Sequence, residues 1–530
     1  MPQRPPRPPN RIRTFSASFP HLFLAGGTHI SSIGTAHEEG AMRRRMHVAY
    51  AVALVMTLWG FAVPALGQGG PPAPIDPAVL AGLETRGEAT FWVLFRDQAD
   101  LAPAFGMRDW GERGRFVYER LVATAESSQA GVQSLLGDLN LQTRSFWIAN
   151  TIEVTTGNRA LPMVLAARPE VAAIIAPPTV ELIVGTIGDV GSPAPGVEWN
   201  IERIRAPEVW TTYGVRGEGI VVGAIDSGVQ YDHPALVAQY RGNLGGGVFD
   251  HNYSWFDPAT TCGSPSDDGP CDTQWHGTAT TGVMVGDDGG ANQIGVAPGA
   301  RFIMAAVDWT TVNLLAAMEW MLAPTDLDGH NPRPDLRPHV VNNSWGAGGG
   351  TMIYQPAVQA WAAAGIFPVF AAGNSGPACQ TMLSPADYPE SYATAASGLD
   401  GAITSFSSRG PALSGLAKPD LTAPGASIRT SVPIDSYQSG MEGTSFAAPH
   451  LSGTVALMLS LNPELIGDVE QIRRHLDLSA LDASDLSCGG DPWRNNVWGE
   501  GRLDAFAAAS LALVDGFESG NTDGWSAVVP

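Results

Sequence analysis

The sequence predicts an α/β protein: a parallel, doubly wound sheet covered by helices on both faces, preceded by a small α+β domain. Between about residues 220 and 371, short apolar runs alternate with segments of helical period. The runs are continuously apolar, which is typical of strands that are buried on both faces. Such strands, separated by helices, form parallel sheets whose sites lie at the carboxyl ends of the strands. With 530 residues, 44% of them hydrophobic, the chain can fill the cores of both domains.

The elements of the parallel sheet are expected in a regular succession. The expected strands are 220–226, 301–307, 339–342 and 367–371. The expected helices are 314–322, 354–364 and one that begins at His276. Polar side chains follow two of the strands, because Asp226 ends the first and Asn374 comes just after the last. The sequence therefore predicts a functional site at this edge of the sheet.

The segment before the sheet carries a different pattern. Its expected elements are strand 90–95, helix 114–139, one or two strands within 145–154, helix 161–167 and strand 171–175. This is the β-α-β-β-α-β order of a ferredoxin-like plait. The predicted domain organisation is an N-terminal segment 1–67, a linker 68–89, the small domain 90–182, a linker 183–196, the large domain 197–513 and a tail 514–530.

Residues 42–67 have the pattern of a secretory signal peptide, and the Pro- and Arg-rich extension 1–41 before them shows no apolar period and suggests no role. Arg43-Arg44-Arg45 precedes the apolar run 48–63, and small residues in Ala65-Leu66-Gly67 provide a cleavage site near Gly67. The alternative is a membrane anchor. The run is shorter than the roughly 20 residues that span a bilayer, and it contains Gly60. We therefore expect an exported protein, extracellular or periplasmic, with no stable membrane anchor.

The net charge limits the partners that the chain can bind, and the cysteine content indicates disulfide bonds. The formal net charge of −22 argues against nucleic acids and anionic membranes, since both bind clustered cations. Four cysteines in an exported chain indicate two disulfides, for which three connectivities exist. We favour Cys262 with Cys271 and Cys379 with Cys488. The alternatives are buried reduced thiols and, for Cys379 near the Asn374 loop, a functional thiol.

Three distant segments supply a nucleophile, a base and a carboxylate. Ser445 begins a long apolar helix after Gly443, His276 opens a helix of small residues, and Asp226 ends a buried strand. A serine hydroxyl attacks a carbonyl only when a base takes its proton and a carboxylate orients that base. A helix start also directs a backbone N–H at a negative oxygen. The alternative for Ser445 alone is a simple helix N-cap.

At these motifs the chain resembles the subtilisin-like serine proteases, the subtilase family, and within it the bacillopeptidase F-like branch. The resemblance covers about 197–513, and the order Asp, His, Ser is the one found in subtilisin. The motifs are Asp226-Ser227-Gly228, His276-Gly277-Thr278, Gly295-Val296-Ala297-Pro298, Ala371-Ala372-Gly373-Asn374-Ser375-Gly376, Ser405-Phe406-Ser407-Ser408-Arg409-Gly410-Pro411 and Gly443-Thr444-Ser445-Phe446-Ala447-Ala448-Pro449-His450. It implies a catalytic triad of Asp226, His276 and Ser445.

The resemblance implies roles for further residues. Asn374 would donate to the oxyanion together with the Ser445 N–H, whereas the alternative is an asparagine in a left-handed turn. A substrate would lie as an added strand on the edge segment 340–346, where Ser344, Trp345 and Gly346 would wall the first pocket. Specificity would therefore be broad, favouring apolar or aromatic residues before the cut. Trp345 has core packing as its alternative. The expected substrate-binding residues are Ser344, Trp345, Gly346, Ala371, Ala372 and Gly373.

The resemblance also implies the partners and cofactors. Domain 90–182 would be an inhibitory propeptide that occupies the cleft and is cut before a mature start within 184–199; the alternative is a free-standing accessory domain. Polypeptide substrates and the propeptide are the expected partners of a monomer. Catalysis should need no cofactor. Calcium remains open, because Ala235 stands where many members have a carboxylate, and Asp287 and Asp288 fit a ligand pair or a solvated acidic turn.

The expected function is therefore that of a secreted serine endopeptidase, synthesised as a zymogen that processes itself. One alternative is a catalytically idle subtilase fold that serves as a binding module, which predicts damage to at least one of four positions: Asp226, His276, Asn374 and Ser445. Another is a relative that uses glutamate in place of the histidine. The intact His276 in its Gly-Thr context argues against the latter.

Overall fold

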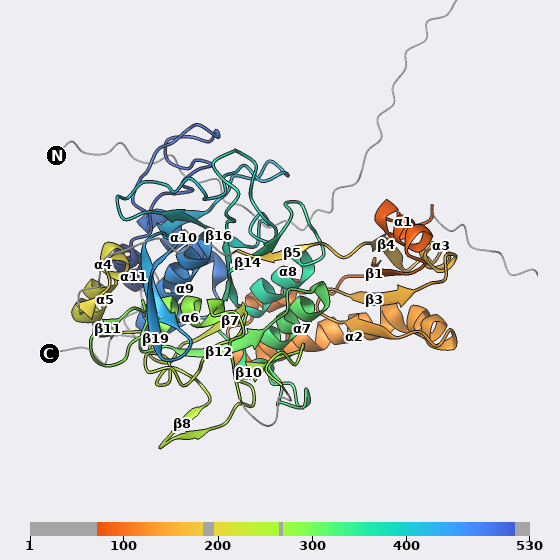
Figure 1. Cartoon of the computed structure of the whole chain (residues 1–530), viewed down its shortest axis with the longest axis horizontal. Helices are drawn as coiled ribbons and strands as arrows, with labels where there is room; N and C mark the ends of the chain where they lie inside the picture. Colours follow the sequence, from red (N-terminus) through yellow and green to blue (C-terminus); the bar gives the residue numbers. More distant parts are fainter. Residues whose placement is uncertain (1–70, 184–195, 264–268, 515–530) are drawn as a thin grey trace, which may run out of the picture. The chain divides into compact units, whose positions relative to one another are not determined.

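The computed structural model describes residues 71–183, 196–263 and 269–514 (Figure 1). The predicted signal peptide, the linker residues 184–195 and the tail from residue 515 lie outside the described residues. Among the described residues, no helix has the length and apolar composition needed to cross a membrane.

A seven-stranded parallel sheet lies at the centre of the large domain. In spatial order its strands are β10 (Trp255–Phe256), β12 (Arg301–Ala306), β7 (Val221–Asp226), β13 (Val340–Asn343), β15 (Phe367–Ala371), β16 (Tyr392–Ser397) and β17 (Leu421–Pro424). Every neighbouring pair is parallel, and β13, β15, β16 and β17 are buried throughout. Full burial explains the continuous apolar runs, and the predicted α/β class is confirmed.

Helices cover both faces of this sheet. Val340 packs into one hydrophobic cluster, which includes residues of α9 (Thr444–Leu461) and α11 (Ala505–Val514). The next residue, Val341, points to the opposite face and packs with α7 (Thr311–Leu322) and α8 (Gln355–Ala364). The remaining helices of the large domain are α4 (Trp199–Arg203), α5 (Ala206–Tyr213), α6 (His276–Val285), α10 (Val469–Ser479) and the short η2 (Pro334–Leu336) and η3 (Pro463–Leu465).

The strand order places a switch point at β7. After β7 the chain forms β10 and β12 on one side of it and then β13 on the other side. Loops diverge at such a point, which opens a crevice at the carboxyl ends of the strands. Asp226, the last residue of β7, lies at this crevice. The smaller strands around the sheet are β6 (Gly196–Val197), β8 (Asn243–Gly245), β9 (Val248–Phe249), β11 (Asn292–Gln293), β14 (Trp345–Ala347), β18 (Ile428–Val432) and β19 (Ser436–Met441).

The small domain contains the six expected elements in the expected order. They are β1 (Ala89–Phe95), α2 (Trp110–Asp138), β2 (Thr143–Phe146), β3 (Thr151–Thr156), α3 (Leu161–Ala166) and β4 (Val171–Ile175), followed by β5 (Val180–Leu182). The sheet order is β2-β3-β1-β4, with antiparallel pairs only. The short helix η1 (Ala102–Gly106) precedes α2, which begins four residues earlier than expected.

The prediction of a linker over 68–89 is wrong at its centre, because this segment contains helix α1 (Pro77–Thr85). The Asp76 carboxylate accepts from the Ala78 N–H, and Pro77 occupies the first helical position, where its missing N–H costs nothing. Val79 and Leu83 are buried in the same cluster as Phe91 of β1. The helix is therefore stabilised by tertiary burial, which the Gly/Pro-rich residues before it obscured in the sequence.

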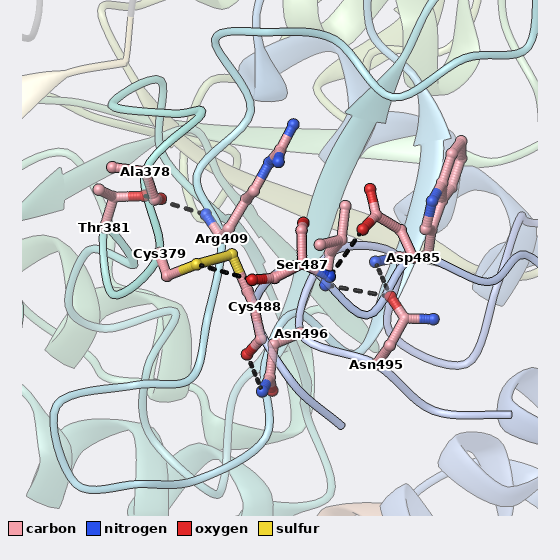
Figure 2. The surroundings of a disulfide bond; sticks show 11 residues. Ala378, Cys379, Thr381, Arg409, Asp485, Ser487, Cys488, Asn495 and Asn496 are labelled. Atoms are coloured by element: carbon pink, nitrogen blue, oxygen red, sulfur yellow. Dashed lines mark hydrogen bonds between the residues drawn. A yellow bond between two sulfur atoms is a disulfide. The ribbon is translucent and has the colours of Figure 1, made fainter. Parts of the chain in front are cut away.

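Both favoured disulfides are present. Cys262 bonds to Cys271 across nine residues, and Cys379 bonds to Cys488 across 109 residues. Figure 2 shows the second bond, which ties the loop carrying Ala378 and Cys379 to the segment around Ser487. Because that loop follows Asn374 directly, the bond restrains the segment that carries this amide. No free cysteine is found in the described part of the chain, so the proposal of a functional thiol at Cys379 is wrong.

Candidate active site

Asp226 and His276 form a buried hydrogen-bonded pair. The Asp226 Oδ1 lies 2.7 Å from the His276 Nδ1, and both side chains are fully buried. The same carboxylate accepts from the Ser227 N–H at 2.7 Å and from the Thr280 hydroxyl at 3.0 Å. With Nδ1–H donated to the carboxylate, the Nε2 of His276 is left as an acceptor. Within the described residues, that buried Nε2 has no hydrogen-bond partner.

Two glycines allow the strand end and the helix start to approach so closely. A Cβ on Gly277 would lie 2.0 Å from the Gly228 carbonyl oxygen, and a Cβ on Gly228 would lie 2.0 Å from the Cys271 oxygen. The Ser227 hydroxyl accepts from the Gly277 N–H at 2.9 Å. Larger residues would therefore push Asp226 and His276 apart, which gives a physical reason for both Gly-containing motifs.

Asp272 fixes the start of α6, although the sequence analysis did not select it. Its carboxylate accepts from the Thr278 N–H and hydroxyl at 2.8 and 2.6 Å and from the Ser227 hydroxyl at 2.8 Å. Burial raises the pKa of Asp272, and the Thr278 hydrogen bonds oppose this shift. Trp275, just before the helix, has a φ of 66°, a strained value for a bulky residue. The position of an aspartate shortly before a helical pattern could have identified Asp272 as a residue that caps the helix start.

Ser445 lies in the first turn of α9. Gly443 precedes the helix with a φ of 148°, a conformation that favours glycine. The Ser445 hydroxyl donates a short hydrogen bond to the carbonyl oxygen of Ile183. The His276 ring lies 5.9 Å from the ring of Phe446, so the histidine is beside the residue that follows the serine. Ser445 therefore makes no N-cap with its side chain; it engages a peptide carbonyl.

The Asn374 side chain is held with its N–H group toward the same carbonyl. Its Oδ1 accepts from the Thr444 N–H and hydroxyl, both at 2.9 Å, which fixes the orientation of the amide. Its Nδ2 lies 3.5 Å from the Ile183 oxygen. Asn374 is absent from the residues with positive φ, so the left-handed-turn alternative does not describe it. Ser445 and Asn374 thus converge on one oxygen atom.

The edge strand β14 binds an extended peptide, and that peptide is the chain's own β5. The pairing is antiparallel, with Trp345 opposite Leu182, Gly346 opposite Glu181 and Ala347 opposite Val180. The Ile183 N–H donates to the Ser344 oxygen at 3.2 Å. The backbone of the predicted edge segment therefore holds residues 180–183 in register with Ser445.

The predicted wall role of Trp345 is wrong for its side chain. The ring is 1% exposed, packs edge-on against Tyr354 and Phe370, and donates its N–H to Asn343. The core alternative describes this ring because it belongs to the cluster beneath the sheet. Only the backbone of Trp345 faces the bound strand.

Three further predicted substrate-binding residues, Ala371, Ala372 and Gly373, lie at the end of β15 and just after it. The Gly373 N–H is bonded to the Thr444 hydroxyl at 3.2 Å, and Gly373 has a φ of 111°. Ala372 donates its N–H to Thr394 and accepts from the Leu383 N–H. Ala371 and Ala372 are fully buried, so they support the loop of Asn374 from below.

His450 is a structural residue. Its Nδ1–H donates to the Phe446 oxygen at 2.7 Å, which leaves its Nε2 to accept from Asn200 at 2.8 Å. Burial lowers the pKa of His450 to about 4, so the ring is neutral at physiological pH. It therefore braces the start of α9 without contacting the carbonyl of Ile183.

The two carboxylates considered for calcium have other partners. Asp287 pairs with Arg216 at 2.9 Å and accepts from the Gly289 N–H. Asp288 accepts from the Gly290 N–H and from Asn292 at 2.6 Å. Asp287 is thus in an ion pair and Asp288 accepts from amide N–H groups, and no cluster of three or more metal-ligating side chains occurs among the described residues. Calcium binding by these two carboxylates stays a prediction.

Comparisons with known proteins agree with the geometry. The sequence pattern of the subtilase family matches residues 217–503. Bacillopeptidase F of Bacillus subtilis (strain 168) is 42% identical over 335 residues, which are 61% of this chain and 22% of that protein. Subtilisin Savinase of Lederbergia lenta is 30% identical over 59% of this chain and 99% of that protein. M-protease of Shouchella clausii (strain KSM-K16) is 30% identical, with 60% and 72% covered. The resemblance inferred from the motifs is thereby confirmed.

Proposed function

The chain belongs to the subtilase family of serine endopeptidases, and we propose that it cleaves peptide bonds through an acyl-enzyme on Ser445. The observation that carries the proposal is the convergence of Ser445 and Asn374 on a peptide carbonyl, beside the Asp226–His276 pair. A site that held only a helix cap would not engage the carbonyl of an extended strand. The idle-module alternative requires damage to one of these four side chains, and all four are present.

Each side chain has a step in the proposed reaction. His276 Nε2 takes the proton from Ser445 Oγ as that oxygen attacks the carbonyl carbon. Asn374 Nδ2 and the Ser445 N–H stabilise the resulting oxyanion. His276 then gives the proton to the leaving amine, and the peptide bond breaks, which leaves an ester on Ser445. Water, deprotonated by His276, hydrolyses the ester. Asp226 orients the ring and stabilises its protonated form throughout.

We further propose that the small domain is an inhibitory propeptide and that the first bond cleaved is Ile183–Val184. Strand β5 on β14 holds residues 180–183 as the acyl side of a substrate, with the Ile183 carbonyl beside Ser445. The bond lies at the start of the predicted linker 183–196. After cleavage residues 180–183 would remain bound in the cleft like a reaction product and block it. The apolar side chain of Ile183, 4% exposed, agrees with the expected preference for apolar residues.

Glu319 of α7 supports the propeptide assignment. Its Oε1 accepts from the backbone N–H groups of Trp147 and Ile148, in the turn between β2 and β3, at 2.6 and 3.2 Å. Burial raises the pKa of Glu319 to about 8, while the two backbone donors lower it. A domain that only trailed the protease by a linker would need no such contact. The small domain is therefore docked by both its last strand and this turn.

Export is part of the same proposal. It is supported by the signal-peptide pattern before residue 68 and by two disulfides, which persist in oxidising compartments.

The test compares Ser445→Ala with Ser460→Ala, a serine near the end of the same helix whose hydroxyl bonds to the Glu218 carbonyl. The full-length wild type and Ser460→Ala should yield a mature protein beginning at Val184, found by N-terminal sequencing, and a serine-directed phosphonate should inhibit both. Ser445→Ala should remain one uncut chain with no peptidase activity. An active Ser445→Ala protein would refute the acyl-enzyme, and a different first cut would refute the assigned bond.

A further inference from the structure

The first turns of α2 contact the large domain at the amino edge of its sheet, away from the cleft. Arg113 is 6% exposed, although it belongs to a helix of the small domain. Its Nε donates to the Ala363 oxygen at 2.6 Å, its Nη1 to the Gly467 oxygen at 2.9 Å and its Nη2 to the Ala362 oxygen at 3.2 Å. All three acceptors are backbone carbonyls of the large domain.

Helix geometry explains this recognition. The last carbonyls of an α-helix have no partner within the helix and carry partial negative charge. Ala362 and Ala363 lie in the last turn of α8, where the Ala362 carbonyl also accepts from the Gly365 N–H. The guanidinium therefore satisfies the Ala363 carbonyl, adds a second donor at Ala362 and complements the helix dipole. A guanidinium has five donors in a fixed plane, which suits three converging oxygens better than the single ammonium of a lysine.

Trp110, beside Arg113, packs against Arg337 and His339 of the large domain. The Arg337 guanidinium lies 3.5 Å from the centre of the Trp110 ring, and the His339 ring stacks on it at 4.8 Å and 19°. Arg337 is 1% exposed and donates to the Ala364 and Pro334 oxygens, so its plane is fixed within the large domain. Cation–π stacking on a fixed guanidinium favours one orientation of the helix.

Three glycines make the contact possible. A Cβ on Gly114 would lie 2.1 Å from Arg337 Nη1 and 2.8 Å from the Pro334 oxygen. A Cβ on Gly365 would lie 3.3 Å from the Trp110 ring, and one on Gly467 would lie 3.1 Å from Arg113 Nη1. The space beside Gly114 is thus filled by Arg337 of the large domain, and the space beside Gly365 and Gly467 by Trp110 and Arg113.

We propose that Trp110 and Arg113 form a second anchor, which holds the propeptide on the large domain after the bond in the cleft is cut. The inference rests on the proposed zymogen function and adds the determinant of propeptide release. His339 precedes β13, so this anchor lies at the amino ends of the strands, whereas Ser445 and Asn374 lie at the carboxyl ends. Because both contacts belong to one domain, each contact raises the effective concentration of the other for its site. Residues 180–183 therefore rebind in the cleft as long as Trp110 and Arg113 stay bound.

The experiment separates docking from catalysis. The full chain carries Ser445→Ala, and a recognition sequence for a site-specific cysteine protease is placed within 184–195. Cutting gives a non-covalent complex, and the dissociation rate of the released small domain is measured by gel filtration over time. Arg113→Ala and Trp110→Ala should each dissociate roughly 10- to 100-fold faster than the parent. Arg115→Ala, an exposed arginine two residues along the same helix, should match the parent.

Two further readouts keep the result decisive. Hydrogen exchange of α2 in the uncut chain shows whether each variant retains the helix, and Arg113→Lys, which keeps the charge, should dissociate at an intermediate rate. Equal dissociation of folded Arg113→Ala, Arg113→Lys and Arg115→Ala would overturn the anchor. Failure of the proposed function would appear elsewhere, as a wild-type chain that never cuts itself, and would leave the ranking of these dissociation rates readable.

Discussion

The small domain contacts the two edges of the central sheet in different ways. At the carboxyl edge, β5 pairs with β14 through backbone atoms, and the Glu181 side chain of β5 is exposed. At the amino edge, the side chains of Trp110 and Arg113 enter a site built from helix carbonyls, a fixed guanidinium and glycines. Backbone pairing accepts most extended peptides, whereas the second contact requires one pair of side chains.

This difference separates two demands on one protein. In the zymogen proposed above, a cleft of broad specificity would bind the backbone of a peptide and could not distinguish the inhibitory domain from a substrate. The second contact, which no short substrate peptide can make, would supply the missing recognition. The expected effects of substitutions therefore differ between the edges, and the largest are expected at the carboxyl edge.

The largest effect is expected for Asp226→Asn. An amide in place of the carboxylate stops holding His276 in the tautomer with a free Nε2, and the loss in rate is on the order of 10⁴ in triads of this kind. The measurement is the rate at which the full chain converts to its two fragments, followed by mass spectrometry. The control is Asp232→Asn, an exposed aspartate in the loop after the same strand, which should convert normally. Normal conversion of Asp226→Asn would remove this carboxylate from the mechanism.

Next in size is the loss of Asn374, which should lower kcat about 10²–10³-fold and leave KM nearly unchanged, a figure that comes from subtilisin, a member of the same family. Asn374→Ala also removes the acceptor for Thr444. Asn374→Asp keeps an acceptor for Thr444 and replaces the donor by an oxygen. Both variants should therefore be slow towards a peptide substrate. If Asn374→Asp had wild-type kcat, the Nδ2 donor would have no part in catalysis.

The carboxyl edge was more predictable from sequence than the amino edge. Asp226, His276 and Ser445 each lie in a short motif whose neighbours explain it, such as the glycines that allow close approach. Strand positions followed from full burial. Arg113, by contrast, looks like any charged residue of an amphipathic helix, and its acceptors lie 249 to 354 residues away. A local sequence pattern cannot predict contacts between residues so far apart in the chain.

The errors of the sequence analysis have the same origin. Helix α1 depends on burial of Val79 and Leu83 against β1, and its short pattern alone resembled a linker. Trp345 stands in the segment predicted to bind substrate, but only its backbone faces the bound strand β5. Tertiary contacts decided each case.

A smaller effect, a roughly tenfold change in the dissociation rate of the small domain, is expected from the protonation of Glu319, which contacts this domain at a third place. Its pKa is about 8 in the docked state, and an exposed glutamate has a pKa near 4.5, so docking takes up a proton. The stabilisation is complete below about pH 4.5 and is lost as the pH rises through about 8. The side chain keeps partial exposure, which limits the size of the effect. Neighbouring Arg144 favours the charged form of Glu319, and the pKa of nearby Tyr118 is raised first by burial and then by the charges of Glu319 and Glu126.

The measurement is the dissociation rate of the small domain from the cut Ser445→Ala complex, taken from about pH 5 to about pH 8.5, the range in which Glu319 loses its proton. The parent complex should dissociate faster as the pH rises. Glu319→Gln keeps an acceptor for the Trp147 N–H but cannot titrate, so its rate should change little across the same range. A Glu319→Gln complex with the same pH dependence as the parent would assign the effect to another group.

The smallest effect is expected for Glu181→Ala. Glu181 pairs with Gly346 through its backbone and its side chain is exposed, so the rate of self-cleavage should stay within about twofold of the wild type. Ile183→Asp is the matched contrast, because it forces a carboxylate into a site where the native side chain is 4% exposed, and it should slow cleavage at least about tenfold. Both rates are read from gels of the full chain. If Glu181→Ala slowed cleavage as much as Ile183→Asp, the cleft would read side chains along the strand, and the two edges would recognise their ligands in the same way.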